Sequence, residues 1–124
     1  MNENELSKIV LDVAFGIHRE LGPGLLESVY EACFAYELRL RRLKVEAQKP
    51  LPIFYKDVML DCGYRLDLVL EDQVILEIKS VSAIAPIHEA QLLSYLRLYA
   101  TCTRGLLINF NVKRLVDGVR RMKI

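Results

Sequence analysis

Tyr64–Ser80 reads YRLDLVLEDQVILEIKS, and this stretch decides the fold of the chain. Two runs of alternating apolar and polar residues flank the acidic triplet Glu71-Asp72-Gln73. Successive side chains of a β-strand point to opposite faces, so each run has one apolar face. The pattern predicts two strands of an antiparallel hairpin whose apolar faces are formed by Leu66, Leu68 and Leu70 and by Val74, Leu76 and Ile78.

The register of this hairpin follows from matching the two apolar faces. Residue 70 should pair with 74, residue 68 with 76 and residue 66 with 78, across a three-residue loop. A shift by one residue would turn the charged side chains into the core. This register places Asp67 opposite Glu77 on the other face, with Lys79 two residues further along.

Asp67 and Glu77 are therefore expected to form a cation site. Carboxylates that face each other across a sheet repel unless a cation or a proton compensates them. Oxygen ligands on strands suit Mg²⁺ or Mn²⁺, and the carbonyl of Ile78 could add a ligand. Such a metal would activate water for phosphodiester hydrolysis, with Lys79 orienting the water or balancing charge. The same pattern of Asp, Glu and Lys also fits a solvated sheet surface.

The rest of the chain alternates between helical and strand patterns. Gly22-Pro23-Gly24 separates the first two helices. We predict helices over Asn4–Leu21, Leu26–Leu43 and Pro86–Ala100, and strands over Val45–Gln48, Leu51–Lys56, Val58–Leu70, Val74–Ser80, Gly105–Phe110 and Val116–Met122. A bulge near Cys62-Gly63 is an open alternative to a regular strand over Val58–Leu70. The first helix should bury Leu6, Ile9, Val10, Val13, Ile17 and Leu21, and the second Val29, Tyr30, Cys33, Phe34 and Leu38.

Length and composition predict one globular domain over residues 1–124, since 52% of the residues are apolar and 27% are charged. No apolar run is long enough to cross a bilayer, and the acidic N-terminus does not resemble a secretory signal. Three widely spaced cysteines without a CxxC pair indicate reduced thiols. We therefore expect a cytoplasmic protein.

Charge is unevenly distributed along the chain although its net value is only +1. Basic residues gather in two segments, at residues 39–49 and 113–123. Such segments permit a surface that faces phosphates, and they also suit the end of a helix or a solvated face.

Several blocks in order resemble the GxxExxY proteins, a family similar to the PD-(D/E)XK nuclease superfamily. Gly24-Leu25-Leu26-Glu27-Ser28-Val29-Tyr30 fits the family signature. The other blocks are Asp67 in RLDLVL, Glu77-Ile78-Lys79, Gln91 and Tyr95 in HEAQLLSYL, and Gly105–Phe110 as GLLINF. Leu66 stands where the superfamily name has Pro, which removes no ligand.

The resemblance implies an α/β fold with a mixed central β-sheet flanked by helices, the restriction-endonuclease-like core. It also implies that Asp67 and Glu77 bind the metal, that Lys79 is the catalytic lysine, and that Glu27 and Gln91 approach the site from the preceding and following helices. The structural interpretation of Glu27 is an acid that complements the start of its helix. For Gln91 and Tyr95 it is a polar residue and an aromatic that pack against the sheet edge, and we expect Tyr95 to be structural. Gly24 and Tyr30 are expected to be architectural.

Three functions are consistent with these expectations. The first is a Mg²⁺-dependent nuclease acting on DNA or RNA; a homodimer would widen its basic surface. The second is a binding module that keeps the nuclease-like fold and contacts nucleic acid or protein without cleaving it. The third is metal-dependent hydrolysis of a smaller phosphorylated substrate. The acid pair favours an enzyme, whereas the weak overall basicity favours a module.

Overall fold

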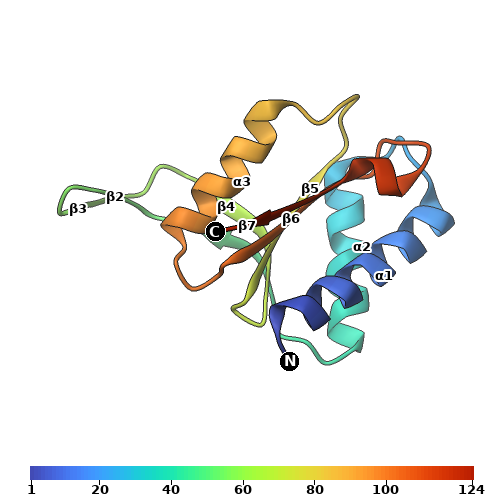
Figure 1. The fold of residues 1–124 in the computed structure, drawn as a ribbon, viewed down its shortest axis with the longest axis horizontal. Helices are drawn as coiled ribbons and strands as arrows, with labels where there is room; N and C mark the ends of the chain where they lie inside the picture. The colour runs from blue at the N-terminus through green and yellow to red at the C-terminus, as the bar shows by residue number, and fades with distance from the viewer.

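The computed structural model describes all residues 1–124, which form an α/β fold around a five-stranded mixed sheet. The elements are α1 (Glu3–Leu21), α2 (Glu27–Leu40), β1 (Val45–Pro50), β2 (Ile53–Tyr55), β3 (Val58–Leu60), β4 (Arg65–Leu70), β5 (Val74–Lys79), α3 (Pro86–Leu98), β6 (Arg104–Asn109), a short 3-10 helix (Leu115–Gly118) and β7 (Val119–Lys123). Helices α1 and α2 cover one face of the sheet and α3 covers the other (Figure 1).

The strand order in the sheet is β1-β4-β5-β6-β7, and only β5 and β6 are parallel. Two parallel neighbours need a crossover connection, and α3 supplies it. The predicted mixed sheet flanked by helices is therefore confirmed, and it is consistent with a restriction-endonuclease-like core.

Two apolar cores lie on the two faces of the sheet. The larger one joins α1 and α2 to Leu68, Leu70, Val74, Leu76 and Ile78 of the hairpin. The smaller one joins α3 to Val69, Ile75 and Leu107. At Gly105 the helix packs closely on the sheet, because a Cβ there would lie 2.9 Å from a methyl carbon of Leu92.

Tyr30 fixes the turn between α1 and α2. Its hydroxyl donates a hydrogen bond to the Gly22 carbonyl at 2.6 Å and accepts one from the Leu25 nitrogen at 3.2 Å. Its ring stacks on Phe110, with the centroids 4.3 Å apart. Gly24 adopts a φ of 97°, which glycine tolerates and other residues rarely adopt. Both contacts agree with the architectural role expected for this turn.

A separate two-stranded hairpin, β2–β3, projects away from the sheet (Figure 1). The predicted strand Val58–Leu70 is wrong as one element, because residues 61–64 separate β3 from β4. The Asp61 carboxylate accepts a hydrogen bond from the Gly63 nitrogen at 3.1 Å, and Gly63 has a φ of 78°. This local turn is incompatible with a continuous strand.

Other boundaries also differ from the prediction. The second helix ends at Leu40 instead of Leu43, and the terminal strand begins at Val119, because residues 115–118 form a 3-10 turn closed by a hydrogen bond from Asp117 to Arg114. Leu21 and Val29 are more exposed than predicted. Leu21 ends its helix beyond the core, and Val29 lies beside the buried stripe that Tyr30, Phe34 and Leu38 form at four-residue spacing.

Candidate active site

Strands β4 and β5 separate next to Asp67. Their ladder pairs 70 with 74, 69 with 75 and 68 with 76, and it continues no further. Beyond it, the Asp67 carboxylate accepts a hydrogen bond from the Ile78 nitrogen at 2.8 Å. A side chain thus occupies the position of a main-chain acceptor, and a gap opens between the strands.

The predicted register is confirmed for two of its three pairs. Pairing of 66 with 78 is absent, and Leu66 packs with Val69 and Ile75 in the smaller core instead of joining Leu68 and Leu70. The separation of the strands explains this error, since the Ile78 nitrogen is bonded to the Asp67 side chain and not to the opposite strand.

Asp67 and Glu77 lie next to each other across this gap. The Asp67 nitrogen is 3.5 Å from Oε1 of Glu77, whose side chain is buried. Burial raises the pKa of Glu77 to about 9, with repulsion from Asp67 adding to the effect. At neutral pH the pair therefore carries a proton unless a cation compensates the second charge.

Lys79 follows on β5 and is half-buried. Its positive charge lowers the pKa of Glu77, which opposes the larger effects of burial and of Asp67. Lys79 forms no ion pair within the chain. The ammonium is thus close enough to influence the acid pair and is free to contact a ligand.

Glu27 connects the start of α2 to the end of β5. Its Oε2 accepts a hydrogen bond from the Ser80 nitrogen at 3.1 Å, and the Ser80 hydroxyl donates to the Leu25 carbonyl at 2.6 Å. The structure thus brings Glu27 to the residue after Lys79. It does not gather Glu27 with Asp67 and Glu77 into one three-ligand group.

Glu31 and Gln48 also belong to this region, and neither was predicted. The Gln48 amide donates to Glu31 at 2.6 Å and lies 3.4 Å from Oδ1 of Asp67. Burial raises the pKa of Glu31; the bond from Gln48 opposes this, and repulsion from Asp67 and Glu27 adds to it. Glu31 lies one helical turn after Glu27, so its helical spacing was a usable signal.

Gln48 has an unusual backbone conformation for a strand residue. Its φ is 50°, in the left-handed region that side chains other than glycine seldom adopt, and the β1–β4 register omits it. Strain of this kind concentrates at functional sites. Here it coincides with the residue that bridges Glu31 and Asp67.

Helix α3 brings Tyr95 near the acid pair, whereas Gln91 makes no contact with it. Burial raises the pKa of Tyr95, and the nearby carboxyl groups of Glu77 and Asp67 raise it further. Gln91 lies one turn earlier, in a pocket of about 380 Å³, and its amide forms no hydrogen bond within the chain. His88 accepts a hydrogen bond from the Ala85 nitrogen at the start of α3.

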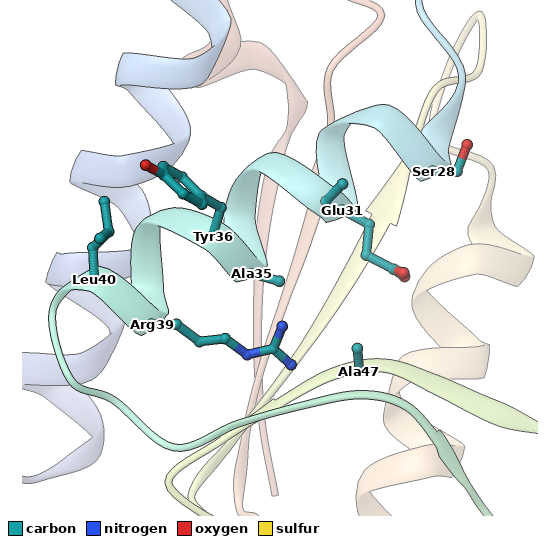
Figure 2. Close-up of a pocket in the computed structure, with 8 residues that line it drawn as sticks. Ser28, Glu31, Ala35, Tyr36, Arg39, Leu40 and Ala47 are labelled. Carbon is teal, nitrogen blue, oxygen red and sulfur yellow. The ribbon is translucent and has the colours of Figure 1, made fainter.

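A pocket of about 520 Å³ lies between α2 and β1, and Glu31 is the one acidic residue that lines it. Figure 2 shows the Glu31 carboxylate and the Arg39 guanidinium on the side of α2 that faces Ala47 of β1. Arg39 donates one hydrogen bond to the Val45 carbonyl at 3.1 Å and pairs with no carboxylate. Its remaining donors are available to an anion.

The donor set fits a hard divalent cation. Burial and, after it, repulsion from Asp67 keep Glu77 protonated at neutral pH. A divalent cation would neutralise the charge of both carboxylates and so take the place of this proton. No three His, Cys, Asp or Glu side chains are gathered to hold a metal by themselves. Mg²⁺ is commonly bound through one or two carboxylates, with water and substrate phosphate as the other ligands.

Comparison with known proteins gives one match. Residues 4–122 match the family model described as the PD-(D/E)XK nuclease superfamily. No curated protein and no solved structure matches the chain. Separately, no helix combines the length and apolar character needed to cross a membrane.

Proposed function

The chain belongs to the PD-(D/E)XK nuclease superfamily, and from this membership we propose that it is a Mg²⁺-dependent nuclease that hydrolyses phosphodiester bonds in DNA or RNA. The adjacency of Asp67 and Glu77 at the gap between β4 and β5 carries the proposal. Nucleases of this superfamily generally use divalent metals, and Mn²⁺ would serve in place of Mg²⁺.

In this proposal Asp67 and Glu77 hold the metal, with the Ile78 carbonyl and Glu27 as further candidate ligands. When bound, the metal supplies charge neutralisation at the phosphate and an activated water. Asp67 is held in place by its hydrogen bond from Ile78, so it needs little rearrangement to bind. Glu77 loses its proton on binding.

Lys79 is proposed as the catalytic lysine. Its unpaired ammonium lies near Glu77. A phosphate bound at the metal beside Glu77 would gain negative charge as its bond to water forms, and the ammonium would stabilise that charge. Gln91 is proposed to contact the substrate through its unpaired amide, from the pocket beside Tyr95. A direct contact of Gln91 with the acid pair would require the α3 side chains to rearrange.

Within the superfamily we propose that the chain is a GxxExxY protein and that residues 1–124 act as one domain. Hydrogen bonds of two signature residues, Tyr30 and Glu27, support this assignment. Tyr30 holds the turn after α1 through Gly22 and Leu25, and Glu27 holds the segment after Lys79 through Ser80. The signature would thus set the position of α2 against the catalytic strand.

A nuclease assay tests the proposal. The wild type and the variants Lys79→Ala and Glu77→Gln are incubated with single-stranded and duplex DNA and RNA, with Mg²⁺ or with a chelator. We expect cleavage by the wild type with Mg²⁺ only, and a loss of at least about a hundredfold in each variant. Lys8→Ala, which changes an exposed lysine of α1 outside the site and outside both basic segments, is the matched control.

Equal trace cleavage by the wild type and Lys79→Ala would contradict the proposal, because a contaminating nuclease would then be responsible. Binding of nucleic acid without any cleavage would favour the second candidate, a non-catalytic binding module. Hydrolysis of small phosphate esters alone would favour the third.

A further inference from the structure

The β2–β3 hairpin and its flanks, residues 52–64, form an arm that contributes no residue to either core, whereas Leu51 at its root lies in the smaller core (Figure 1). Its large apolar side chains face solvent: Phe54, Tyr55, Val58, Met59, Leu60 and Tyr64. The protein exposes 7221 Å² in total, against about 6,800 Å² expected for a compact monomer of 14.3 kDa.

The arm has little to stabilise it within one chain. Each strand has three residues, and an isolated two-stranded hairpin is marginal in water. Phe54 and Tyr55 are adjacent in one strand and so point to opposite faces, yet both are 63% exposed. Both faces of the hairpin are therefore apolar and uncovered, and both of its edges are unpaired.

The apolar surface continues from the root of the arm onto α3. A pocket of about 380 Å³ lies there, with Ile53 and Tyr64 of the arm and Ile87, Tyr95 and Leu98 of α3 in its walls. Ile87 and Leu98 are themselves exposed. With the arm residues, they present on the order of 800 Å² of apolar surface, about the area that each partner of a stable complex buries.

We propose that two copies of this chain form a two-fold dimer in which the apolar side chains of the β2 and β3 strands of each arm pack into the pocket at the root of the other arm. A two-fold interface requires a self-complementary patch, and this one contains both the projecting group and the pocket that receives it. This proposal is independent of the nuclease activity.

The charges of the arm are also self-complementary. Lys56 lies at the tip, and Asp57 and Asp61 lie on the same arm; none of the three forms an ion pair within the chain. Asp57 lies beside Lys56 at the tip and Asp61 lies after β3, so when two arms run in opposite directions the ammonium of one faces Asp61 of the other. Because Tyr95 lines the pocket and lies near Glu77, the second arm covers one flank of the candidate active site.

The mass of the protein in solution tests the dimer. Light scattering and sedimentation of the full chain should give twice the monomer mass of 14.3 kDa. The double variant Phe54→Glu/Met59→Lys should give the monomer mass, with an unchanged circular-dichroism spectrum because neither residue belongs to a core and the two opposite charges pair across the strands. Leu26→Glu is the matched control: Leu26 is 75% exposed and lies outside the arm, so this variant should remain a dimer.

Hydrogen exchange of the wild type gives a second measurement that needs no variant. Amides of residues 53–60 should become more protected as the protein concentration rises, whereas those of α1 should not change. A wild type that stays monomeric at all concentrations overturns the proposal, and so does a double variant that keeps the dimer mass. Protection of the arm that is independent of concentration would also overturn it.

Discussion

The Asp67 carboxylate and the Ile78 nitrogen lie 2.8 Å apart, at the point where β4 and β5 stop pairing. The Ile78 nitrogen thus donates to a side-chain carboxylate instead of to a main-chain carbonyl of β4. It holds Asp67 beside Glu77 at the sheet and keeps the two strands apart. A charged residue in this position is costly unless it is compensated, which connects the local break in the sheet to the binding of a cation.

Metal binding should release a proton from Glu77. Because the pKa of Glu77 is about 9 without metal, the cation must displace a proton at neutral pH. We expect the affinity for Mg²⁺ or Mn²⁺ to rise by about tenfold per pH unit between pH 6 and 8. Calorimetry in buffers of different ionisation enthalpy measures the released proton, and Asp67→Ala and Glu77→Ala should bind little metal.

The variant Glu46→Gln serves as the control for this titration, since Glu46 pairs with Lys44 and Lys49 away from the acid pair. Its metal affinity should match that of the wild type. An affinity that does not depend on pH, or one that survives both alanine substitutions, would show that the cation is held elsewhere.

Stability of the metal-free protein should fall as the pH rises. The pKa of Glu77 is about 9 in the folded chain and 4.5 in its ordinary state, so between these values only the folded chain holds the proton. The free energy of unfolding then decreases with pH, by at most about 1.4 kcal/mol per unit. Glu77→Gln should flatten this slope in urea titrations with a chelator present. An equal slope in the variant would contradict the assignment.

The hairpin could be predicted because its information is local. Alternation over residues 64–80 indicated both strands, the three-residue loop and the pairing of 68 with 76, and the structure confirms these features. The same alternation misplaced Leu66, since it assumes a continuous ladder. Nothing in the pattern shows that a carboxylate will take the place of a main-chain acceptor at Asp67.

The residues that were missed depend on contacts distant in sequence. Gln48 meets Asp67 because β1 pairs with β4, and that pairing joins strands separated by the arm. Its positive φ has no signature in a glutamine. Glu31 was different, because its spacing from Glu27 already placed both on one face of α2. Residues 53–60 were predicted as parts of two ordinary strands, Leu51–Lys56 and Val58–Leu70, and only the structure shows that their large apolar side chains from Phe54 to Leu60 lack a covering layer.

Tyr30→Phe should loosen the link between α2 and the catalytic strand. The variant keeps the ring stacked on Phe110 and loses the hydrogen bonds to Gly22 and Leu25. We expect a loss of about 1–2 kcal/mol in the free energy of unfolding. Chemical denaturation measures it, with Tyr36→Phe, which changes an exposed tyrosine, as control. Equal free energies of unfolding for Tyr30→Phe and the wild type would show that these hydrogen bonds do not stabilise the fold.

Gln48 allows backbone strain to be separated from its side-chain contacts. Gln48→Ala and Gln48→Gly both remove the amide that bridges Glu31 and Asp67, but only glycine adopts a φ of 50° without strain. We expect the glycine variant to be more stable than the alanine variant by about 1 kcal/mol. Paired urea titrations measure the difference. A more stable alanine variant would argue against a strained conformation at Gln48.

Arg39 should contact a phosphate of the nucleic acid beyond the cleaved bond. It follows Glu31 by eight residues on α2, about 12 Å along the helix, a distance of roughly three to four stacked nucleotides. Its guanidinium faces the cavity next to β1 and pairs with no carboxylate (Figure 2). Binding of labelled oligonucleotides with Ca²⁺ in place of Mg²⁺, so that cleavage does not interfere, would test this contact.

Arg39→Gln should weaken this binding and reduce the slope of log affinity against log salt by about 0.7 for a single strand or 0.9 for a duplex. Arg39→Lys should restore most of the slope, because it keeps the charge and loses only the planar donor geometry. Arg97→Gln removes an exposed arginine of α3 and is the control. An unchanged slope in Arg39→Gln, together with unchanged metal affinity, would show that Arg39 does not contact the nucleic acid and that the nucleic acid binds along a different face of the protein.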